Sequence, residues 1–270
     1  MASVTVRTLA AKKRAGEPIV ALTAYDAATA MLEQKAGVDL ILVGDSMNMA
    51  VLGEETTLTV DLEVMLAHTR AVSRGAPRTL VVGDMPFGSY EESDAQAVGN
   101  AVRFLAEGAA HAVKLEGGNR MALSRAGAIV EAGIPVMGHL GLLPQSLRLT
   151  GGYRVVRADG LQRLQAEAAA LEDAGVFSIV LESVQEDVAA QVTAGCTVPT
   201  IGIGAGRGVD GQILVVNDML GLTPGFSPRF LKRYADLAPV IEEAVRRYAG
   251  EVREGVFPGD EHVYGAKEEN

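Results

Sequence analysis

The chain has 270 residues, of which 48% are hydrophobic and 21% are charged, with 31 glycines and 10 prolines. This composition is that of a globular protein and excludes a disordered or collagen-like chain. The 24 basic against 34 acidic residues give a net charge of −10, and no basic cluster is longer than Lys12-Lys13-Arg14. We therefore expect no nucleic-acid partner. A run of about 18 apolar residues, which a membrane-spanning helix needs, is also missing.

The cysteine content and the start of the chain indicate the compartment. Cys196 is the single cysteine, which excludes an intramolecular disulfide and a cysteine-based metal site and fits a reducing cytosol. Residues 1–16 contain four basic side chains and no acid, as in some transit peptides, but lack the apolar core of a secretory signal. We interpret this segment as an N-terminal helix of the domain and expect a cytoplasmic protein.

Short apolar runs alternate with longer segments along the chain. The runs are rich in Val, Ile and Leu, and most lack polar alternation, which predicts strands buried on both faces of a parallel sheet. They are 18–24, 39–44, 78–84, 111–116, 134–138, 177–182, 198–203 and 213–216. The segments between them have apolar residues every three to four positions and predict helices at 26–36, 60–74, 92–108, 120–132, 159–174 and 186–194.

Eight strands with intervening helices predict a single α/β domain over 1–270, a (β/α)8 TIM barrel rather than an open sheet. The link between the last two strands is too short for a full helix. A closing helix is expected at 228–248, followed by a charged tail, 251–270, interpreted as a loose cap or an oligomer contact. Several helices end in an Ala-Gly pair, where a left-handed glycine would stop the helix; these glycines are Gly37, Gly133, Gly175 and Gly195.

Acidic residues end four of the predicted strands. Active sites of such barrels lie at the C-terminal ends of the strands, and those ends carry Asp45, Asp84, Glu116 and Glu182. Carboxylates are poor strand formers and are costly to bury, so packing does not explain four of them at one rim. Crowded carboxylates need a cation. Because two Asp and a Glu are hard oxygen ligands and the chain has only four His, we expect Mg²⁺ at Asp45, Asp84 and Glu116.

Lys114 and Glu182 suggest the chemistry that would accompany the metal. Lys114 stands two residues before Glu116, so both point to the same side of a strand. Three roles are open for Lys114. It could anchor an anionic substrate, form a Schiff base, or form an ion pair with Glu116 or Glu182. The many acids count against the Schiff base, which needs a lowered lysine pKa. Glu182 is the candidate general base. Together these groups suit enolate chemistry on an oxo acid, in which the metal polarises the carbonyl and holds the enolate.

Three further features lie near the expected mouth of the barrel, and two of them have two interpretations each. The glycine-rich segment 202–206 follows the seventh strand and is a phosphate-binding loop or a tight turn. Residues 151–154 look like a mobile loop over the mouth of the barrel. His139, just past the fifth predicted strand, either hydrogen-bonds a metal ligand or substrate or is a core histidine.

The same residues lie in a series of longer motifs. These include Gly-Asp-Ser at 44–46, Gly-Asp-Met-Pro-Phe-Gly-Ser-Tyr at 83–90, Val-Lys-Leu-Glu-Gly-Gly at 113–118, Gly-His-Leu-Gly-Leu at 138–142, Pro-Gln-Ser at 144–146 and Asp-Met-Leu-Gly at 218–221. In this order the chain resembles the ketopantoate hydroxymethyltransferase family from about residue 3 to about residue 250.

The resemblance implies a Mg²⁺-dependent transferase of pantothenate biosynthesis, which moves a hydroxymethyl group from 5,10-methylenetetrahydrofolate to 3-methyl-2-oxobutanoate and gives 2-dehydropantoate. By position, it implies that Asp45, Asp84 and Glu116 bind the metal directly or through water. It implies that Ser46 and Lys114, with Asp45 and Asp84, hold the oxo acid, and that Glu182 accepts the proton. The resemblance also implies a homo-oligomer, commonly a decamer.

The chain departs from the family pattern at three places. Asn48 stands where the family often has Gly, Asn217 stands where it often has His, and residues 156–158 replace a Gln-Gly stretch. None of them coincides with the expected metal, anchor or base, although folate binding and the loop over the mouth are left open.

Two other classes of protein compete with this interpretation. The first is another enzyme on the same barrel, either a metal-dependent pyruvate aldolase or a relative of isocitrate lyase and phosphoenolpyruvate mutase. Isocitrate lyase relatives have a reactive cysteine near the fourth strand, whereas Cys196 precedes the seventh. The second is a catalytically idle barrel that acts as a scaffold or ligand sensor, which would have no reason to keep four carboxylates at its mouth.

Overall fold

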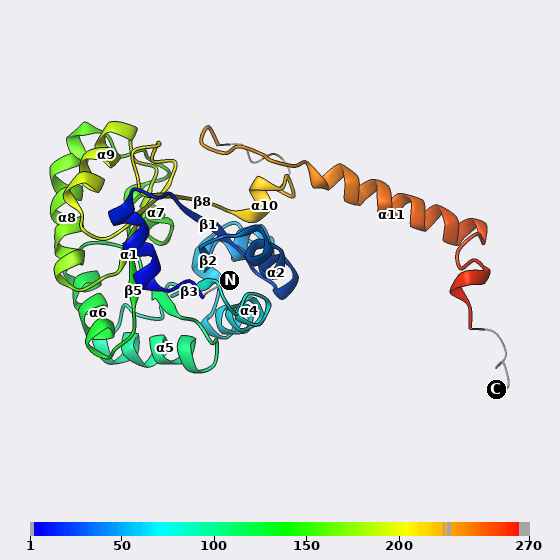
Figure 1. Cartoon of the computed structure of the whole chain (residues 1–270), viewed down its shortest axis with the longest axis horizontal. Helices are drawn as coiled ribbons and strands as arrows, with labels where there is room; N and C mark the ends of the chain where they lie inside the picture. Colours follow the sequence, from blue (N-terminus) through cyan, green and yellow to red (C-terminus); the bar gives the residue numbers. More distant parts are fainter. Residues whose placement is uncertain (1–2, 224, 226–227, 265–270) are drawn as a thin grey trace.

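Over residues 3–223, 225 and 228–264, which the computed structural model describes, the chain forms a closed barrel of eight parallel strands in sequence order (Figure 1). The strands are β1 (Ile19–Thr23), β2 (Leu40–Val43), β3 (Leu80–Asp84), β4 (Ala112–Lys114), β5 (Val136–Gly141), β6 (Ser178–Glu182), β7 (Thr200–Ile203) and β8 (Gly211–Leu214). β1 pairs with β8, which closes the sheet. The barrel predicted from the sequence is confirmed.

Helices follow each strand from β1 to β6 and surround the barrel, β7 connects to β8 without a helix, and the last long helix lies apart from the barrel (Figure 1). The longer ones are α1 (Val6–Ala15), α2 (Ala27–Ala36), α4 (Leu62–Gly75), α5 (Asp94–Ala106), α6 (Arg120–Glu131), α8 (Leu161–Asp173), α9 (Glu186–Gly195) and α11 (Leu237–Glu254). Shorter helices are α3 (Met47–Ala50), α7 (Leu147–Thr150) and α10 (Val216–Met219), with 3₁₀ turns at Thr57–Thr59, Pro144–Ser146, Ala158–Gly160 and Asp260–His262. None of the described helices is both long and apolar enough to cross a membrane.

The segment at the start of the chain is a helix of the domain, as expected. Leu9 of α1 is fully buried and belongs to the apolar cluster inside the barrel, together with Leu40 and Leu80. Lys12 pairs with Asp39 at 2.6 Å and Lys13 pairs with Asp210 at 2.8 Å, at the starts of β2 and β8. α1 therefore closes the end of the barrel that lies opposite the C-terminal ends of the strands.

The strands are buried on both faces because helices cover the outside. In β2 all four residues are buried, with Leu40 and Leu42 in the inner cluster and Ile41 and Val43 in the layer between strands and helices. This is why the strands appear in the sequence as continuous apolar runs rather than as alternating patterns.

Several predicted boundaries differ from the structure. β5 continues to Gly141, three residues past its expected end, so His139 lies within the strand and not after it. β8 begins at Gly211, and Val216 starts α10 instead of ending the strand. The glycines at 37, 133 and 175 are left-handed at helix ends, with φ of 87°, 85° and 91°. Gly195 is instead the last residue of α9, and the chain leaves that helix through Cys196 in an extended conformation.

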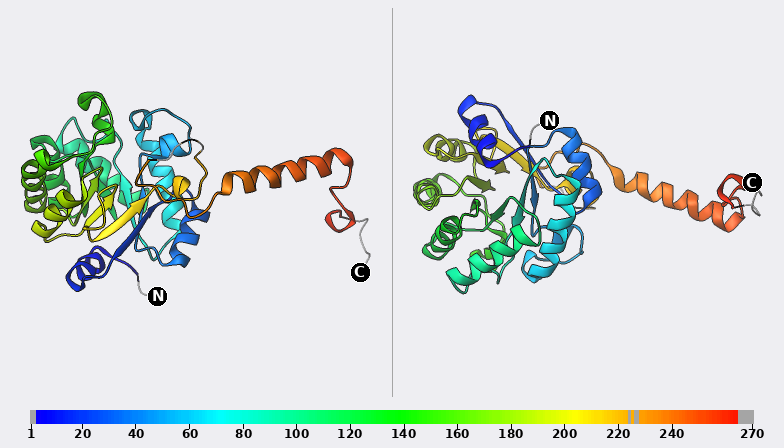
Figure 2. Two further views of the ribbon diagram at one scale, coloured as in Figure 1. Left: turned by 90° about the horizontal axis from the view of Figure 1, so that it is seen from above. Right: turned by 60° about the horizontal axis from the view of Figure 1, so that its bottom comes forward.

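The closing helix expected at 228–248 is wrong in both extent and placement. α11 spans Leu237–Glu254, has no buried residue and projects away from the barrel (Figure 2). The first four residues of the expected charged tail therefore belong to this helix, and 265–270 lie outside the described residues. An amphipathic pattern indicates that one face of a helix is covered, but it does not indicate by which surface.

Candidate active site

A cavity of about 290 Å³ opens at the C-terminal ends of the strands. Its polar side chains are those singled out in the sequence: Asp45, Ser46, Asp84, Lys114, Glu116, His139 and Glu182. Its apolar wall includes Leu42, Val180, Ile203, Ile213 and Phe230. The barrel thus brings every predicted site residue to one cavity, although they come from β2, β3, β4, β5, β6 and the turns that follow them.

A tight turn after β2 places Asp45 and Ser46 in the cavity. A Cβ on Gly44 would lie 2.8 Å from Ser46 Oγ and 3.8 Å from Asp84 Oδ2, so a side chain at this position would displace the serine. The Ser46 hydroxyl lies 3.0 Å from the Tyr25 hydroxyl, which fixes its position. The backbone N–H of Asp45 donates to Asp84 Oδ2 at 3.1 Å, and this bond holds the two acids side by side.

Lys114 is an ammonium group surrounded by acids. Its Nζ lies 2.6 Å from Asp84 Oδ1 and 4.0 Å from Glu116 Oε1, and the Lys114 side chain is 4% exposed. Burial lowers the pKa of Lys114, but the charges of Asp84 and Glu116 outweigh it and raise the pKa above its ordinary value. A Schiff-base lysine needs the opposite shift, so the geometry favours an electrostatic role. Among the described residues, the ion pair is with Asp84 and Glu116 and not with Glu182.

Asp45 is buried beside two further acids. Burial, followed by the charges of Asp84 and Glu116, raises the pKa of Asp45 to about 8. Burial also raises the pKa of Asp84, although Lys114 opposes this effect. A cation held between these two carboxylates would relieve the repulsion.

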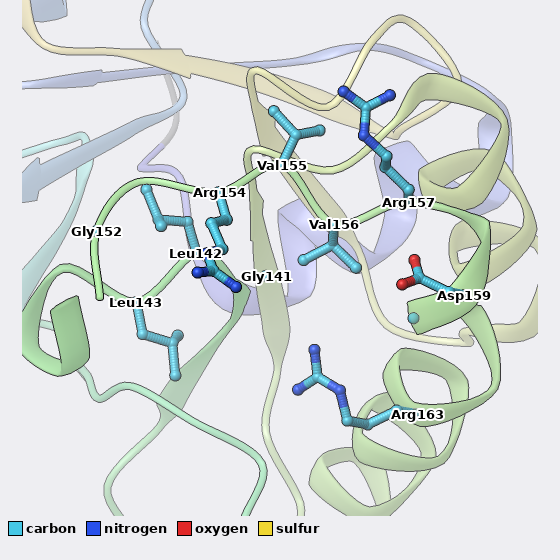
Figure 3. A pocket seen from close by; sticks show the side chains of 11 residues that line it. Gly141, Leu142, Leu143, Gly152, Arg154, Val155, Val156, Arg157, Asp159 and Arg163 are labelled. Carbon is cyan, nitrogen blue, oxygen red and sulfur yellow. The ribbon is translucent and has the colours of Figure 1, made fainter. Parts of the chain in front are cut away.

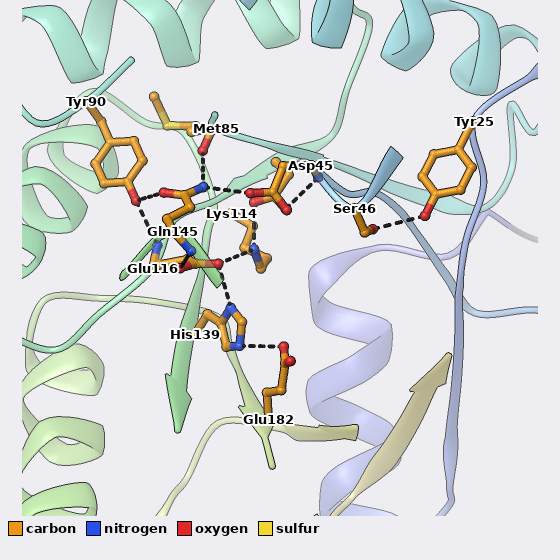
Figure 4. Close-up of polar contacts among 11 residues, drawn as sticks. Tyr25, Asp45, Ser46, Met85, Tyr90, Lys114, Glu116, His139, Gln145 and Glu182 are labelled. Atoms are coloured by element: carbon orange, nitrogen blue, oxygen red, sulfur yellow. Dashed lines mark hydrogen bonds and ion pairs between the residues drawn. The ribbon is translucent and has the colours of Figure 1, made fainter. Parts of the chain in front are cut away.

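His139 lies between two carboxylates on the inner face of β5 (Figure 4). Its Nδ1 is 3.4 Å from Glu116 Oε1, and its Nε2 is 3.3 Å from Glu182 Oε2. Burial lowers the pKa of His139, but the facing carboxylates of Glu116 and Glu182 outweigh burial and raise it to about 9. The ring lies between the acid cluster and Glu182, and the carboxylates on both sides favour its protonated form.

Gln145 and Tyr90 also belong to this cluster, and neither was assigned a role from the sequence. The Gln145 amide donates to Asp45 Oδ2 at 3.0 Å and to the Met85 carbonyl at 3.1 Å (Figure 4). Its backbone N–H donates to Glu116 Oε2 at 3.1 Å, and the Tyr90 hydroxyl donates to Gln145 Oε1 at 2.5 Å. The one available signal was the polar side chain of Gln145 in the Pro-Gln-Ser motif just after β5.

The carboxylates suit a metal in their chemistry but are not gathered around one point. Within the described part of the chain, no three His, Cys, Asp or Glu side chains form a group that could hold a metal ion. In the same part of the chain, Glu116 Oε1 is buried without a hydrogen-bond partner. Mg²⁺ commonly takes one or two protein carboxylates, with waters and substrate oxygens completing its shell. The adjacent Asp45 and Asp84 fit that pattern, and the three-residue ligand set stays a prediction.

The segment 202–206 forms a tight turn. Gly204 and Gly206 have φ of 63° and 74°, Ala205 between them is buried, and the Gly206 carbonyl accepts a hydrogen bond from Gln212 Nε2 at 2.7 Å. The loop 151–154 brings Tyr153 to the active-site cavity, which agrees with a position over its mouth.

The departures from the family pattern have structural partners. Asn48 is buried and its Nδ2 donates to the Thr56 carbonyl at 2.6 Å and to Thr59 Oγ1 at 2.7 Å, which anchors the loop after α3. Asn217 Nδ2 donates to the Ala50 carbonyl at 3.4 Å, at the end of the same helix. Val156 forms a parallel bridge with Val184, just beyond β6. These contacts hold loops of the rim and do not involve the acid cluster.

The sequence matches one family over almost its whole length. The family model described as ketopantoate hydroxymethyltransferase matches residues 3–260. The chain is 52% identical over 262 residues to the 3-methyl-2-oxobutanoate hydroxymethyltransferase of Desulfotalea psychrophila, covering 96% of this chain and 94% of that protein. It is 50% identical over 266 residues to the enzyme of the same name from Carboxydothermus hydrogenoformans, covering 98% and 96%.

Solved structures share the fold at much lower identity. A phosphonopyruvate hydrolase in complex with oxalate and Mg²⁺ superposes with a TM-score of 0.63 at 17% identity, covering 98% of this chain and 93% of that one. A 2,3-dimethylmalate lyase of the phosphoenolpyruvate mutase/isocitrate lyase superfamily gives 0.62 at 18% identity, covering 97% and 92%. These structures share the barrel fold with this chain. The high sequence identity over nearly the full length is with the hydroxymethyltransferases. The chain therefore belongs to the ketopantoate hydroxymethyltransferase family of transferases.

Proposed function

We propose that the protein transfers a hydroxymethyl group from 5,10-methylenetetrahydrofolate to 3-methyl-2-oxobutanoate, giving 2-dehydropantoate in pantothenate biosynthesis, and that it requires Mg²⁺. The observation that supports this best is the arrangement of charge in one cavity. A lysine ammonium and two adjacent carboxylates lie on one side, and Glu182, linked through His139, lies on the other.

The two walls of the cavity match the two ends of the oxo acid. The Lys114 ammonium and the Ser46 hydroxyl are donors for the oxo-acid oxygens. The apolar wall, which includes Leu42, Val180 and Ile213, suits the isopropyl group. A substrate held in this way would place C3 between the anchored oxygens and the apolar wall, in the cavity that Glu182 also lines.

Asp45 and Asp84 are the residues that would hold Mg²⁺, with Glu116 as the third expected ligand. When bound, the cation draws electron density from the keto oxygen and so acidifies the C3 hydrogen. The Glu182 carboxylate accepts that proton, and His139 holds Glu182 in position through the 3.3 Å contact. A bond then forms between C3 and the one-carbon unit, the carbon–nitrogen bonds to the folate break, and water supplies the hydroxyl oxygen.

Glu182→Gln tests the base assignment because it keeps the shape and removes the basicity. Wild-type enzyme with Mg²⁺ should exchange the C3 hydrogen of 3-methyl-2-oxobutanoate for deuterium without folate, as followed by proton NMR. In the variant, exchange and overall turnover should both fall by roughly 10²–10⁴-fold. Glu131→Gln, an exposed position at the end of α6, is the control and should keep both.

Two results would contradict parts of this proposal. If exchange survives in Glu182→Gln while turnover is lost, another group takes the proton and Glu182 acts on the folate side. If wild-type exchange continues unchanged in excess chelator, the cation has no part in the acidification of C3.

We also propose that the protein assembles with copies of itself, and the family resemblance suggests a decamer. α11 has an apolar stripe formed by Ile241, Val245, Tyr248 and Val252, each at least 45% exposed. On the barrel, Val20 of β1 is 49% exposed, and the described chain has only the short α10 between β8 and α11. An apolar stripe on a projecting helix is unfavourable in water unless another protein surface covers it. The occupant that we propose for the exposed side of β1 and β8 is α11 of a second copy.

A further inference from the structure

A second cavity, of about 460 Å³, is lined by the loop after α7 and the start of α8 (Figure 3), and it shares its wall with the active-site cavity. The two cavities are separated by the segments after β5 and α7. Leu143 and Gly152 line the second cavity, whereas their chain neighbours Pro144 and Tyr153 line the active-site cavity. One molecule that reaches across this wall would contact both cavities.

The second cavity is basic, in contrast to the rest of the molecule. Arg154, Arg157 and Arg163 line it, with Asp159 as the acidic residue in its wall. Among the described residues, Arg154 and Arg157 make neither an ion pair nor a side-chain hydrogen bond, and Arg163 uses Nη1 to bind Glu167 at 3.1 Å. In a chain of net charge −10, the Arg154 guanidinium and the N–H groups of Arg163 other than Nη1 are available to bind an anion beside this cavity.

The arginines are presented from two directions. The guanidinium groups of Arg154, from the loop, and of Arg163, from the first turn of α8, point into the same space, whereas Arg157 points away (Figure 3). The loop is held by Val156, whose N–H donates to the Ser183 carbonyl at 2.9 Å and whose carbonyl accepts from Gln185 N–H at 2.8 Å. The arginine cavity is thereby fixed to the end of β6, next to Glu182.

We propose that the arginine cavity binds the glutamate carboxylates of the folate co-substrate, with Arg154 and Arg163 as their partners. This inference rests on the proposed function. The one-carbon unit has to reach C3 of the oxo acid in the active-site cavity, while the glutamate tail has to leave it. In the active-site cavity the groups that can hold a carboxylate, Lys114 and Ser46, are taken by the oxo acid, and the acidic side chains there repel further carboxylates. The neighbouring basic cavity is therefore where the tail is stabilised.

The double variant Arg154→Gln/Arg163→Gln tests the inference. For 5,10-methylenetetrahydrofolate with three glutamates, its KM should rise about 10-fold, the size expected for the loss of two solvent-exposed charge pairs. Its kcat, its KM for the oxo acid and its folate-independent deuterium exchange should match those of the wild type. The charge-conserving variant Arg154→Lys/Arg163→Lys should recover most of the affinity. Arg14→Gln in α1, at the opposite end of the barrel, controls for the loss of a positive charge.

A substrate without the glutamate tail, 5,10-methylenetetrahydropteroate, separates tail binding from a structural effect. Its KM should be the same for the wild type and the double variant. An equal rise in KM for both substrates, or no rise for either, overturns the inference. If deuterium exchange is normal in that case, the proposed function is unaffected. A wild-type enzyme that neither exchanges the C3 hydrogen nor turns over the folate would instead refute the proposed function. Should the double variant fold poorly, the two single variants give the same comparison.

Discussion

Gln145 determines how the acidic residues are spaced. Its amide connects Asp45 to the Met85 carbonyl, its backbone N–H binds Glu116, and Tyr90 fixes the orientation of its carbonyl oxygen. The side chain therefore connects the segments that follow β2 and β3, and the backbone N–H adds the segment that follows β4. Loss of a group that orients metal ligands typically lowers metal affinity by roughly 10–100-fold.

Gln145→Ala should weaken the response to Mg²⁺ without unfolding the barrel. The change removes the side-chain bonds to Asp45 and Met85 but keeps the backbone bond to Glu116. The Mg²⁺ concentration for half-maximal activity should rise about 10-fold or more. Gln165→Ala, on the exposed side of α8, is the matched control. A Mg²⁺ titration of activity that is identical for all three proteins would show that Gln145 does not position the metal site.

Glu33 on α2 gives a test of stability against pH. Both of its carboxylate oxygens are buried and, within the described residues, lack hydrogen-bond partners. Burial, and then the charge of Asp26, raises the pKa of Glu33 to about 8. Since the folded pKa lies above the unfolded value of 4.5, the folded state loses stability as pH rises from about 4.5 to about 8.

Glu33→Gln should therefore be more stable than the wild type, by an amount that grows from pH 5 to pH 8 and is constant above pH 8. Thermal unfolding followed by circular dichroism over this range measures the difference. Glu17→Gln, an exposed site before β1, should show no such trend. A difference that does not change with pH would mean that Glu33 already ionises normally in the folded protein.

The strand-end acids and Lys114 were predictable because their positions follow from periodicity alone. A parallel barrel places all strand ends at one rim, so residues far apart in sequence meet there. Gln145 and Tyr90 were not predictable in this way, since they belong to loops whose course depends on packing between segments. For His139 the sequence leaves two interpretations open, a partner of a metal ligand or substrate and a core histidine, and only the structure places it beside Glu116 and Glu182.

At the scale of elements, the strands and helices follow from apolar spacing, and their ends follow from local contacts. Gly141 shows how local such a contact can be. It has φ of 96°, and a Cβ there would lie 2.2 Å from the Glu182 carbonyl. That carbonyl accepts a hydrogen bond from Leu142 N–H at 2.8 Å. The last residue of β5 must therefore be glycine for Glu182 of β6 to lie beside it.

Gly141→Ala should destabilise the protein by about 2–4 kcal/mol, because the added methyl group collides with β6 and the backbone is left-handed. Turnover should also fall, since Glu182 moves with the displaced strand. The control is Gly127→Ala in α6, where a Cβ meets nothing within 4 Å and alanine favours the helix by about 1 kcal/mol. Urea unfolding of both variants gives the comparison, and equal stabilities would contradict it.

For the whole molecule, assembly should depend on the apolar stripe of α11. Ile241→Glu/Val245→Glu places two charges in the stripe, whereas Arg247→Glu changes the net charge equally on another face of the helix. Sedimentation velocity should show a smaller particle for the stripe variant and an unchanged one for Arg247→Glu. The same sedimentation coefficient for all three proteins would mean that α11 is not an interface between copies.

The barrel closes only when β1 pairs with β8, which joins Ile19 to Gly211 across most of the chain. Every strand pair before that step joins strands that are neighbours in sequence, so the last pairing is the one that must bring distant segments together. α11 lies beyond β8 and makes its proposed contacts with another chain. Refolding then includes two kinds of step. Closure of the barrel within each chain is first order, and the exchange of α11 between chains is second order. Dilution would slow the second event while leaving the first unchanged.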